Sequence, residues 1–205
     1  MKYAKLILLI AVFLTVFSGC QKEDPLADAP NPIATITMED GSEMRFELYY
    51  SAAPHTVGNF IALANDGFYD GLEFFRVVPG VFIQSGDPNN DGTGGAGYTI
   101  RGEFSENGLG GDNPSHMRGT ISMARLEDDM NSASSQFFIM QGNYPEYDGY
   151  YASFGRALDD ETLAMIDTIA SQTVDANYRP MKKYTIRYIR VNTHDYEYPY
   201  QTITD

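Results

Sequence analysis

Short segments in which apolar and polar residues alternate, separated by Gly-rich turns, recur along the chain from residue 33 onward. Alternation with a period of two is typical of β-strands that bury one face. The runs 33–38 and 44–48 flank the turn dipeptide Asp40-Gly41 and predict a β-hairpin. Further strands are predicted at 73–77, 81–85, 120–123, 136–140, 153–157 and 184–191. Many short strands indicate a mostly β domain, either a barrel or a sandwich.

Two segments show helical spacing instead. Val57, Phe60, Ile61 and Ala64 follow Pro54 and predict one short amphipathic helix. A second helix is predicted over residues 161–171, and both helices would cap the β domain. We find no internal repeat, and about 200 residues is the size of one domain.

Composition excludes several classes of site. The 205 residues include one cysteine, so an intramolecular disulfide, a CxxC site and an iron–sulfur cluster are excluded. The three histidines lie far apart in sequence, and neither a metal nor a cofactor is expected. The formal charge of −14, with no basic run longer than Lys182-Lys183, argues against a nucleic-acid partner.

The N-terminus has the pattern of an export signal. Lys2 and Lys5 precede an apolar run, 6–17, that suits a signal peptide and is too short to span a bilayer. Small residues then lead to Cys20, which resembles the lipobox of bacterial lipoproteins. We therefore expect a signal peptide over 1–19 and lipidation of Cys20. The alternative is an ordinary secretory signal with an incidental cysteine.

Residues 20–32 are expected to be the lipidated cysteine and a flexible acidic tether. The start of this tether, 21–24, resembles a signal that some Gram-negative bacteria use to place lipoproteins on the cell surface, or it is a solvated linker. The expected location is the bacterial cell envelope, with a lipid anchor in the outer membrane and the domain facing the periplasm or the cell surface. The Tyr-rich, acidic residues 192–205 are expected to form a loose tail.

Several apparent motifs are better explained as structure. Residues 87–92 imitate the first half of an EF-hand loop, but Tyr98 stands where a bidentate carboxylate is needed, so a tight turn is expected. The glycines of 92–97 lack the Gly-Lys-Ser/Thr ending of a phosphate-binding loop. The acidic runs 127–129 and 159–161 are interpreted as solvated surfaces.

Two stretches place single polar groups among aromatic rings. In strand geometry Arg76 and Val78 share one face, and Phe82 and Gln84 share a face after the Pro79-Gly80 turn. An Arg and a Gln beside aromatic rings need partners, or a ligand, for their donors.

At these residues the chain resembles the cyclophilins, a family of peptidyl-prolyl cis–trans isomerases. The resemblance covers roughly residues 33–191. It is carried by a series of motifs in order: Thr56-Val57-x-Asn59-Phe60, Phe74-x-Arg76-Val77-Val78-Pro79-Gly80, Gln84-x-Gly86-Asp87, Gly92-Thr93-Gly94-Gly95, Gly119-Thr120-Ile121-Ser122-Met123-Ala124, Ser135-Gln136-Phe137-Phe138-Ile139 and Phe154-Gly155.

The resemblance implies a closed eight-stranded antiparallel β-barrel capped by two helices, with a peptide groove on its outer surface. It implies that Arg76 is catalytic, with Gln84 and Phe138 as further catalytic-site residues. The substrate-binding residues that it implies are Val78, Val81, Phe82, Gly92, Ala124, Arg125, Gln136, Tyr147 and Tyr151. Rotation about an X–Pro bond breaks no covalent bond, so no nucleophile, cofactor or metal is needed.

The sequence departs from the best-known family pattern at several positions. Phe75 stands where animal members carry His, and Val81 and Phe82 replace a usual Phe and Met. Glu146 falls near the Trp that supports tight cyclosporin binding, which lowers the expected affinity for cyclosporin. Tyr151 stands where many members carry His. These changes leave catalysis expected.

The sequence thus predicts a monomeric, lipid-anchored prolyl isomerase that acts on proline-containing segments of exported proteins. The alternative is a non-catalytic module that binds proline peptides, or acts as a chaperone, through the same groove. A surface adhesin that uses the Tyr-rich tail is a third hypothesis and rests on composition alone.

Overall fold

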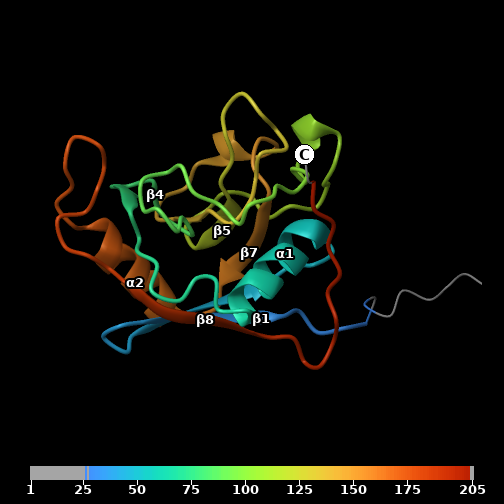
Figure 1. Cartoon of the computed structure of the whole chain (residues 1–205), viewed down its shortest axis with the longest axis horizontal. Coiled ribbons are helices and arrows are strands. Elements are labelled where there is room, and N and C mark those ends of the chain that lie inside the picture. The colour runs from blue at the N-terminus through green and yellow to red at the C-terminus, as the bar shows by residue number, and fades with distance from the viewer. Residues whose placement is uncertain (1–25, 27, 204–205) are drawn as a thin grey trace, which may run out of the picture.

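The computed structural model describes residue 26 and residues 28–203, which form eight strands and two α-helices (Figure 1). The expected signal peptide, Cys20 and the first part of the tether lie outside the described residues. The elements in chain order are β1 (Ile33–Met38), β2 (Glu43–Leu48), α1 (Pro54–Asn65), β3 (Arg76–Val78), β4 (Phe82–Ser85), β5 (Thr120–Met123), β6 (Phe137–Met140), β7 (Ser153–Ala157), α2 (Asp160–Ala170) and β8 (Ile186–Asn192), with short 3-10 turns at Ser105–Asn107 and Pro145–Tyr147.

The strands form one antiparallel sheet in the order β3-β4-β6-β5-β7-β2-β1-β8. The predicted hairpin is confirmed, since β1 pairs with β2 with Ile36 opposite Met44. On its other side β1 pairs with β8, where Ile36 faces Ile189. The alternating pattern therefore located the strands along the chain, whereas pairing between segments distant in sequence sets their order across the sheet.

The closed barrel predicted above is wrong, because the sheet is an open half-barrel that ends at β3 and β8. Between these ends, Glu73 and Thr185 form an isolated bridge, and the Phe74 N–H donates to the Tyr184 carbonyl over 2.9 Å. Strand β3 is only three residues long and begins later than predicted. The outward N–H of its central residue, Val77, donates to the Tyr178 carbonyl in the α2–β8 loop over 2.8 Å, so a loop occupies the edge that closure would require.

The main core lies between the inner face of the sheet and the two helices. Helix α1 packs against β8 and α2 against β2. The Phe60 ring of α1 lies 5.3 Å from the Tyr69 ring, 5.5 Å from the Phe137 ring and 5.3 Å from the Phe154 ring. Burial of such rings is the main favourable contribution to folding of a domain of this size.

The first turns of the two helices are satisfied differently. Asp159 caps α2 locally, since its Oδ1 accepts the Thr162 N–H over 2.8 Å. Helix α1 begins at Pro54 without a side-chain cap of its own. Its donors are met by the buried carboxylate of Glu103, which accepts the His55 N–H over 3.0 Å and the Thr56 N–H over 2.7 Å.

The C-terminal residues contradict the expected loose tail. Strand β8 ends at Asn192, and residues 193–203, here called the C-terminal strap, return along α1 (red in Figure 1). The Tyr198 ring is buried against the Tyr50 ring, with centroids 5.0 Å apart. At the end of the strap Ile203 forms an antiparallel bridge with Thr99. Within the described residues no helix is long and apolar enough to cross a membrane.

Candidate active site

The outer face of four neighbouring strands gathers the residues that the sequence singled out. The register pairs Arg76 with Gln84, Val78 with Phe82, and Gln84 with Phe138. Because residues alternate between the faces of a strand, these side chains share the outer face while Val77, Ile83 and Ile139 enter the core. The two predicted pairs, Arg76 with Val78 and Phe82 with Gln84, are confirmed, and the register shows that both pairs lie on the same face.

A chain of side-chain hydrogen bonds orients the Arg76 guanidinium. Arg76 Nη1 donates to Gln84 Oε1 over 3.1 Å, and Gln84 Nε2 donates to Gln136 Oε1 over 2.9 Å. Gln136 Nε2 in turn donates to the carbonyls of Gly92 and Gly94 over 3.1 and 2.9 Å. A guanidinium has five N–H donors, so one bond to Gln84 fixes its direction and leaves other donors for a ligand.

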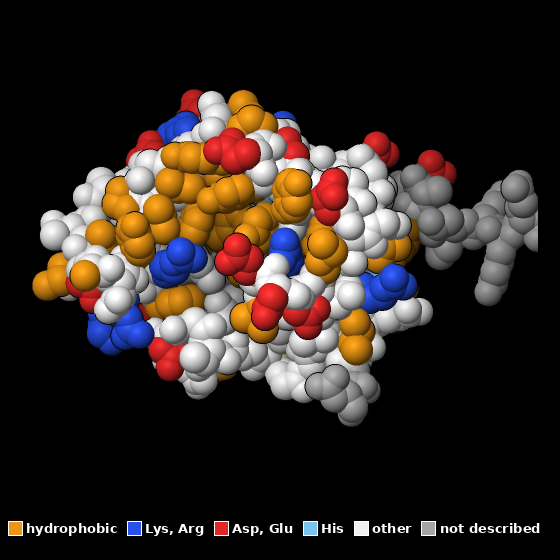
Figure 2. All heavy atoms as spheres, turned by 90° about the horizontal axis from the view of Figure 1, so that it is seen from above, with side chains coloured by type: hydrophobic (Ala, Val, Ile, Leu, Met, Phe, Trp, Pro, Cys, Tyr) orange, Lys and Arg blue, Asp and Glu red, His pale blue; other side chains and the backbone are white. Residues whose placement is uncertain are grey.

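An apolar cluster lies beside this polar chain. Phe82, Phe138 and Met140 are buried, and the rings of Phe82 and Phe138 lie 5.3 Å apart. The Arg76 guanidinium lies over the Phe82 ring, 5.1 Å from its centroid. Partly buried side chains that pack against this cluster are Val78, Val81, Ala124, Tyr144, Tyr147 and Tyr151. Figure 2 shows hydrophobic side chains gathered on one face of the molecule, beside Lys or Arg side chains.

A groove of about 1030 Å³ begins at Arg76 and continues past the glycine-rich residues 92–97. Six of the predicted site residues line it: Arg76, Gln84, Gly92, Ala124, Arg125 and Gln136. The others, Val78, Val81, Phe82, Phe138, Tyr147 and Tyr151, lie in the apolar cluster, and Ala124 belongs to both places. The structure therefore brings together every predicted site residue except Cys20, which lies outside the described residues.

Ala124 and Arg125 already donate hydrogen bonds to other groups of the protein. The Ala124 N–H donates to the Gln136 carbonyl over 2.9 Å, so a peptide at this position would use the Ala124 carbonyl. Arg125 Nε donates to the Tyr150 carbonyl over 2.9 Å, and its guanidinium lies 4.9 Å from the centroid of the Tyr151 ring. Arg125 thereby shapes the wall of the groove.

The turn at residues 87–92 is held by one buried carboxylate. Asp87 Oδ1 accepts the Asn89 N–H over 2.8 Å, and Oδ2 accepts the Asp91 N–H over 3.0 Å and the Gly92 N–H. These bonds confirm the predicted tight turn. Among the described residues no group of three or more His, Cys, Asp or Glu side chains is arranged to hold a metal ion.

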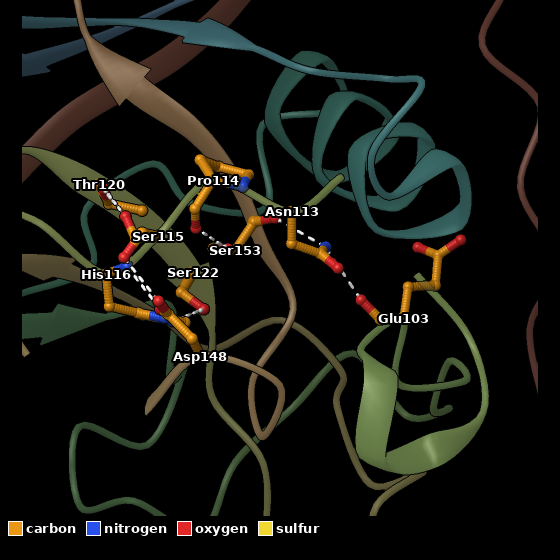
Figure 3. Close-up of polar contacts among 9 residues, drawn as sticks. All are labelled: Glu103, Asn113, Pro114, Ser115, His116, Thr120, Ser122, Asp148 and Ser153. Carbon is orange, nitrogen blue, oxygen red and sulfur yellow. Dashed lines mark hydrogen bonds and ion pairs between the residues drawn. The ribbon is translucent and has the colours of Figure 1, made fainter. Parts of the chain in front are cut away.

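Sequence reasoning missed His116, which packs against Phe138 of the apolar cluster. Figure 3 shows its ring beside Asp148 and Ser122. Its fully buried ring stacks on Phe138 with centroids 5.9 Å and planes 15° apart. Nδ1 lies 2.8 Å from Asp148 Oδ1, and Nε2 lies 3.1 Å from Ser122 Oγ. Asp148 is 32 residues away in sequence, and no local pattern marks the pair.

The protonation of this group follows from its contacts. Burial disfavours the Asp148 carboxylate, but hydrogen bonds from Ser115, the His116 N–H and the His116 ring outweigh it and hold the pKa of Asp148 below its usual value. An ionised carboxylate only accepts, so His116 Nδ1 carries a proton and Nε2 accepts from Ser122. Burial lowers the pKa of His116, although Asp148 opposes this shift.

The Ser122–His116–Asp148 arrangement has the order of contacts found in hydrolase triads. However, Ser122 is fully buried in β5, and no substrate could reach its hydroxyl. The trio therefore supports the back of the Phe138 pocket.

Comparison with known proteins shows close relatives of one family. The family model described as cyclophilin type peptidyl-prolyl cis-trans isomerase/CLD matches residues 33–191. A peptidyl-prolyl cis-trans isomerase of Synechococcus elongatus is 43% identical over 66% of this chain and 87% of its own length. One from Helicobacter pylori is 40% identical over 72% of this chain and 85% of its own length. The peptidyl-prolyl cis-trans isomerase B of Bacillus subtilis is 47% identical over 58% of this chain and 78% of its own length.

A solved structure is similar in fold. The crystal structure of a Cryptosporidium parvum cyclophilin type peptidyl-prolyl cis-trans isomerase, in the presence of the dipeptide Ala-Pro, superposes with a TM-score of 0.67 at 30% sequence identity. The match covers 78% of this chain and 98% of that chain.

Proposed function

The chain belongs to the cyclophilin-type peptidyl-prolyl cis–trans isomerases, and from this premise we propose that Arg76 is its catalytic residue and the apolar cluster its proline pocket. The observation that carries the proposal is the Arg76 guanidinium, which is held by Gln84 and lies over the Phe82 ring at the junction of the groove and the cluster.

The chemistry of X–Pro rotation matches these residue types. Rotation crosses a barrier of about 20 kcal/mol and takes tens to hundreds of seconds without a catalyst. Twisting the amide breaks its resonance and returns electron density to the proline nitrogen. A donor aimed at that nitrogen therefore stabilises the transition state more than the planar ground state.

Arg76 can supply such a donor without reorganisation. Its bond to Gln84 and its position over Phe82 fix the guanidinium before a substrate arrives. One preorganised hydrogen bond in a partly dry site is worth about 3 kcal/mol, or about a hundredfold in rate. The remaining acceleration would come from holding the proline ring while the other side of the bond rotates.

The cluster around Phe82 and Phe138 would hold the proline ring. Both rings are buried, and Val78, Val81 and Tyr147 pack around them, so the cluster offers an apolar contact surface beside the Arg76 guanidinium. The twisted amide is less polar than the planar one, and an apolar pocket favours it for that reason. An extended peptide would continue along the groove past Ala124 and Gly92.

NMR exchange spectroscopy with a proline tetrapeptide tests the assignment. We expect Arg76→Ala to lower kcat/KM about a hundredfold with the fold intact, and Arg76→Lys to recover little, because an ammonium lacks the planar fork. Arg187→Ala, on the exposed face of β8, is the matched control and keeps wild-type activity. An Arg76→Ala protein with full activity would refute the role of Arg76.

The same experiment addresses the rival function, a module that binds proline peptides without turnover. That function would be indicated if the wild-type protein bound the peptide in a titration but did not accelerate exchange. Titration of Arg76→Ala separates the two contributions, because a catalytic role for Arg76 predicts retained binding without turnover.

We also propose that the enzyme acts on exported proteins from a lipid anchor on Cys20. The basic end, the apolar run 6–17 and the small residues before Cys20 support this location. Labelled palmitate should enter the wild-type protein and not a Cys20→Ser variant. Protease treatment of intact cells then distinguishes a domain on the cell surface from one in the periplasm.

A further inference from the structure

The C-terminal strap reaches the peptide groove from the far side of α1. Figure 1 shows it leaving β8 and passing α1. Its last described residue, Ile203, lines the groove. The Tyr198 hydroxyl donates to the Pro30 carbonyl over 3.2 Å, and the Gln201 N–H donates to His55 Nδ1 over 3.2 Å. The strap is therefore attached at several points before it reaches the groove.

Helix α1 is adapted to this crossing. A Cβ atom on Gly58 would lie 2.7 Å from the Tyr198 carbonyl oxygen and 2.9 Å from Tyr200 Cβ. Any side chain larger than that of glycine would therefore displace the strap. A glycine inside a helix costs about 1 kcal/mol relative to alanine, so close approach of the strap is the feature that this glycine permits.

The last described residue of the strap is paired with the wall of the groove. The Ile203 N–H donates to the Thr99 carbonyl over 2.6 Å, and the Thr99 N–H donates to the Ile203 carbonyl over 3.2 Å. The adjacent Tyr98 carbonyl accepts from Ser134 Oγ over 2.6 Å, and all four residues line the groove that contains Arg76. The bridge thus fixes Ile203 against the groove wall.

Ile203 adds apolar surface to one wall of a groove whose lining mixes charged and polar residues with apolar ones such as Phe75 and Leu126. Charged side chains on its wall come from Arg125 and Asp129 and from Asp91 and Arg179, whereas Ile203 is an aliphatic side chain that remains 36% exposed. An apolar side chain of a bound peptide can cover this surface, and the removal of both apolar surfaces from water stabilises the complex.

We propose that the C-terminal strap is a specificity element of the isomerase, in which Ile203 selects peptides with a large apolar side chain at a position removed from the proline. This inference rests on the proposed function, since it takes the groove beside Arg76 as the peptide site. Binding energy gained away from the reacting bond would be used to orient the X–Pro bond against Arg76.

A peptide panel tests the proposal. In an Ala-Pro background, Leu replaces Ala at each position on both sides of the proline in turn, and kcat/KM is measured by NMR exchange for wild type and Ile203→Ala. We expect one position at which wild type prefers Leu. At that position Ile203→Ala should reduce the Leu/Ala ratio about fourfold for each methylene group that no longer packs against the peptide.

Two further variants separate the strap from a general effect. Gly58→Ala changes no residue of the groove but displaces the strap, so it should reduce the same ratio at the same position. Met181→Ala removes an exposed apolar side chain that does not line the groove and should leave the ratio unchanged. Equal Leu/Ala ratios for wild type and Ile203→Ala at every position overturn the strap proposal, whereas a wild-type protein without any acceleration overturns the proposed function instead.

Discussion

Replacing His116 with phenylalanine removes a buried titratable ring and puts a somewhat larger apolar ring in its place. The change deletes the interactions with Asp148 Oδ1 at 2.8 Å and with Ser122 Oγ at 3.1 Å. Asp148 keeps the bond from Ser115 and is partly exposed, so water can replace the ring donor. Ser122 is fully buried and is left without its partner, which predicts a loss of about 1–3 kcal/mol in the free energy of unfolding at pH 7.

The effect should depend on pH with a defined sign. Burial lowers the pKa of His116 in the folded protein below its usual 6.5. The unfolded chain therefore takes up a proton near pH 6.5 that the folded chain does not, and the stability due to His116 falls as the pH drops below that value. The fall is at most about 1.4 kcal/mol per pH unit for one proton. Asp148 stays ionised across this range because its pKa is lowered, and the facing Tyr147 has a raised pKa and stays neutral.

Urea denaturation at pH 7.5, 6.5 and 5.5, followed by circular dichroism, measures the difference between wild type and His116→Phe. We expect wild type to lose its advantage progressively as the pH falls. The double variant His116→Phe/Ser122→Ala should recover about 1 kcal/mol, since it removes the buried hydroxyl that lacks a partner. A difference that is constant over the three pH values would show that His116 is not the buried neutral group described above.

Three further substitutions test local features by urea denaturation. Asp159→Ala removes the cap of α2 and should cost about 1 kcal/mol, whereas Asp159→Ser, which keeps an acceptor for the Thr162 N–H, should recover most of it. Gly86→Ala should cost at least about 2 kcal/mol, because φ is +88° and the new Cβ would clash with the Ser135 carbonyl oxygen. A cost below about 0.5 kcal/mol for Gly86→Ala would contradict that geometry. Asp87→Ala deletes the three hydrogen bonds that the Asp87 carboxylate accepts from backbone N–H groups, and it should cost about 3 kcal/mol of folding free energy. It should also speed amide exchange in the 89–92 turn, and Asp87→Asn should have a smaller effect. Unchanged exchange would refute the role of this carboxylate.

The strands and helices could be read from the sequence because their signals are local. The period of two from residue 33 and the turn at Asp40-Gly41 located β1 and β2, and Pro54 located the start of α1. The same period paired Arg76 with Val78 and Phe82 with Gln84; the register of β3 and β4 agrees with both pairs and shows that they share one face. Local signals thus determined which side chains share a face.

Features that depend on contacts between distant segments were not predictable. At the open edge of the sheet, the Val77 N–H donates to the carbonyl of Tyr178, which lies in a loop much further along the chain. The Tyr-rich tail has the composition of a loose segment, yet Tyr198 packs on Tyr50 and Ile203 pairs with Thr99. One signal of the packed tail was present in the sequence: Gly58 lies inside the predicted helix, and a glycine there permits the close approach of another segment.

The contact between Glu103 and the start of α1 has a consequence for synthesis on the ribosome. The first-turn N–H groups of α1, including that of Thr56, have as their acceptor a carboxylate that lies 47 residues further along the chain. At about 5–20 residues per second, Glu103 is made roughly 2–9 s after Thr56. Without Glu103, α1 lacks its cap, and we expect its stable helical form to appear only after residue 103 has reached the compartment in which the domain folds.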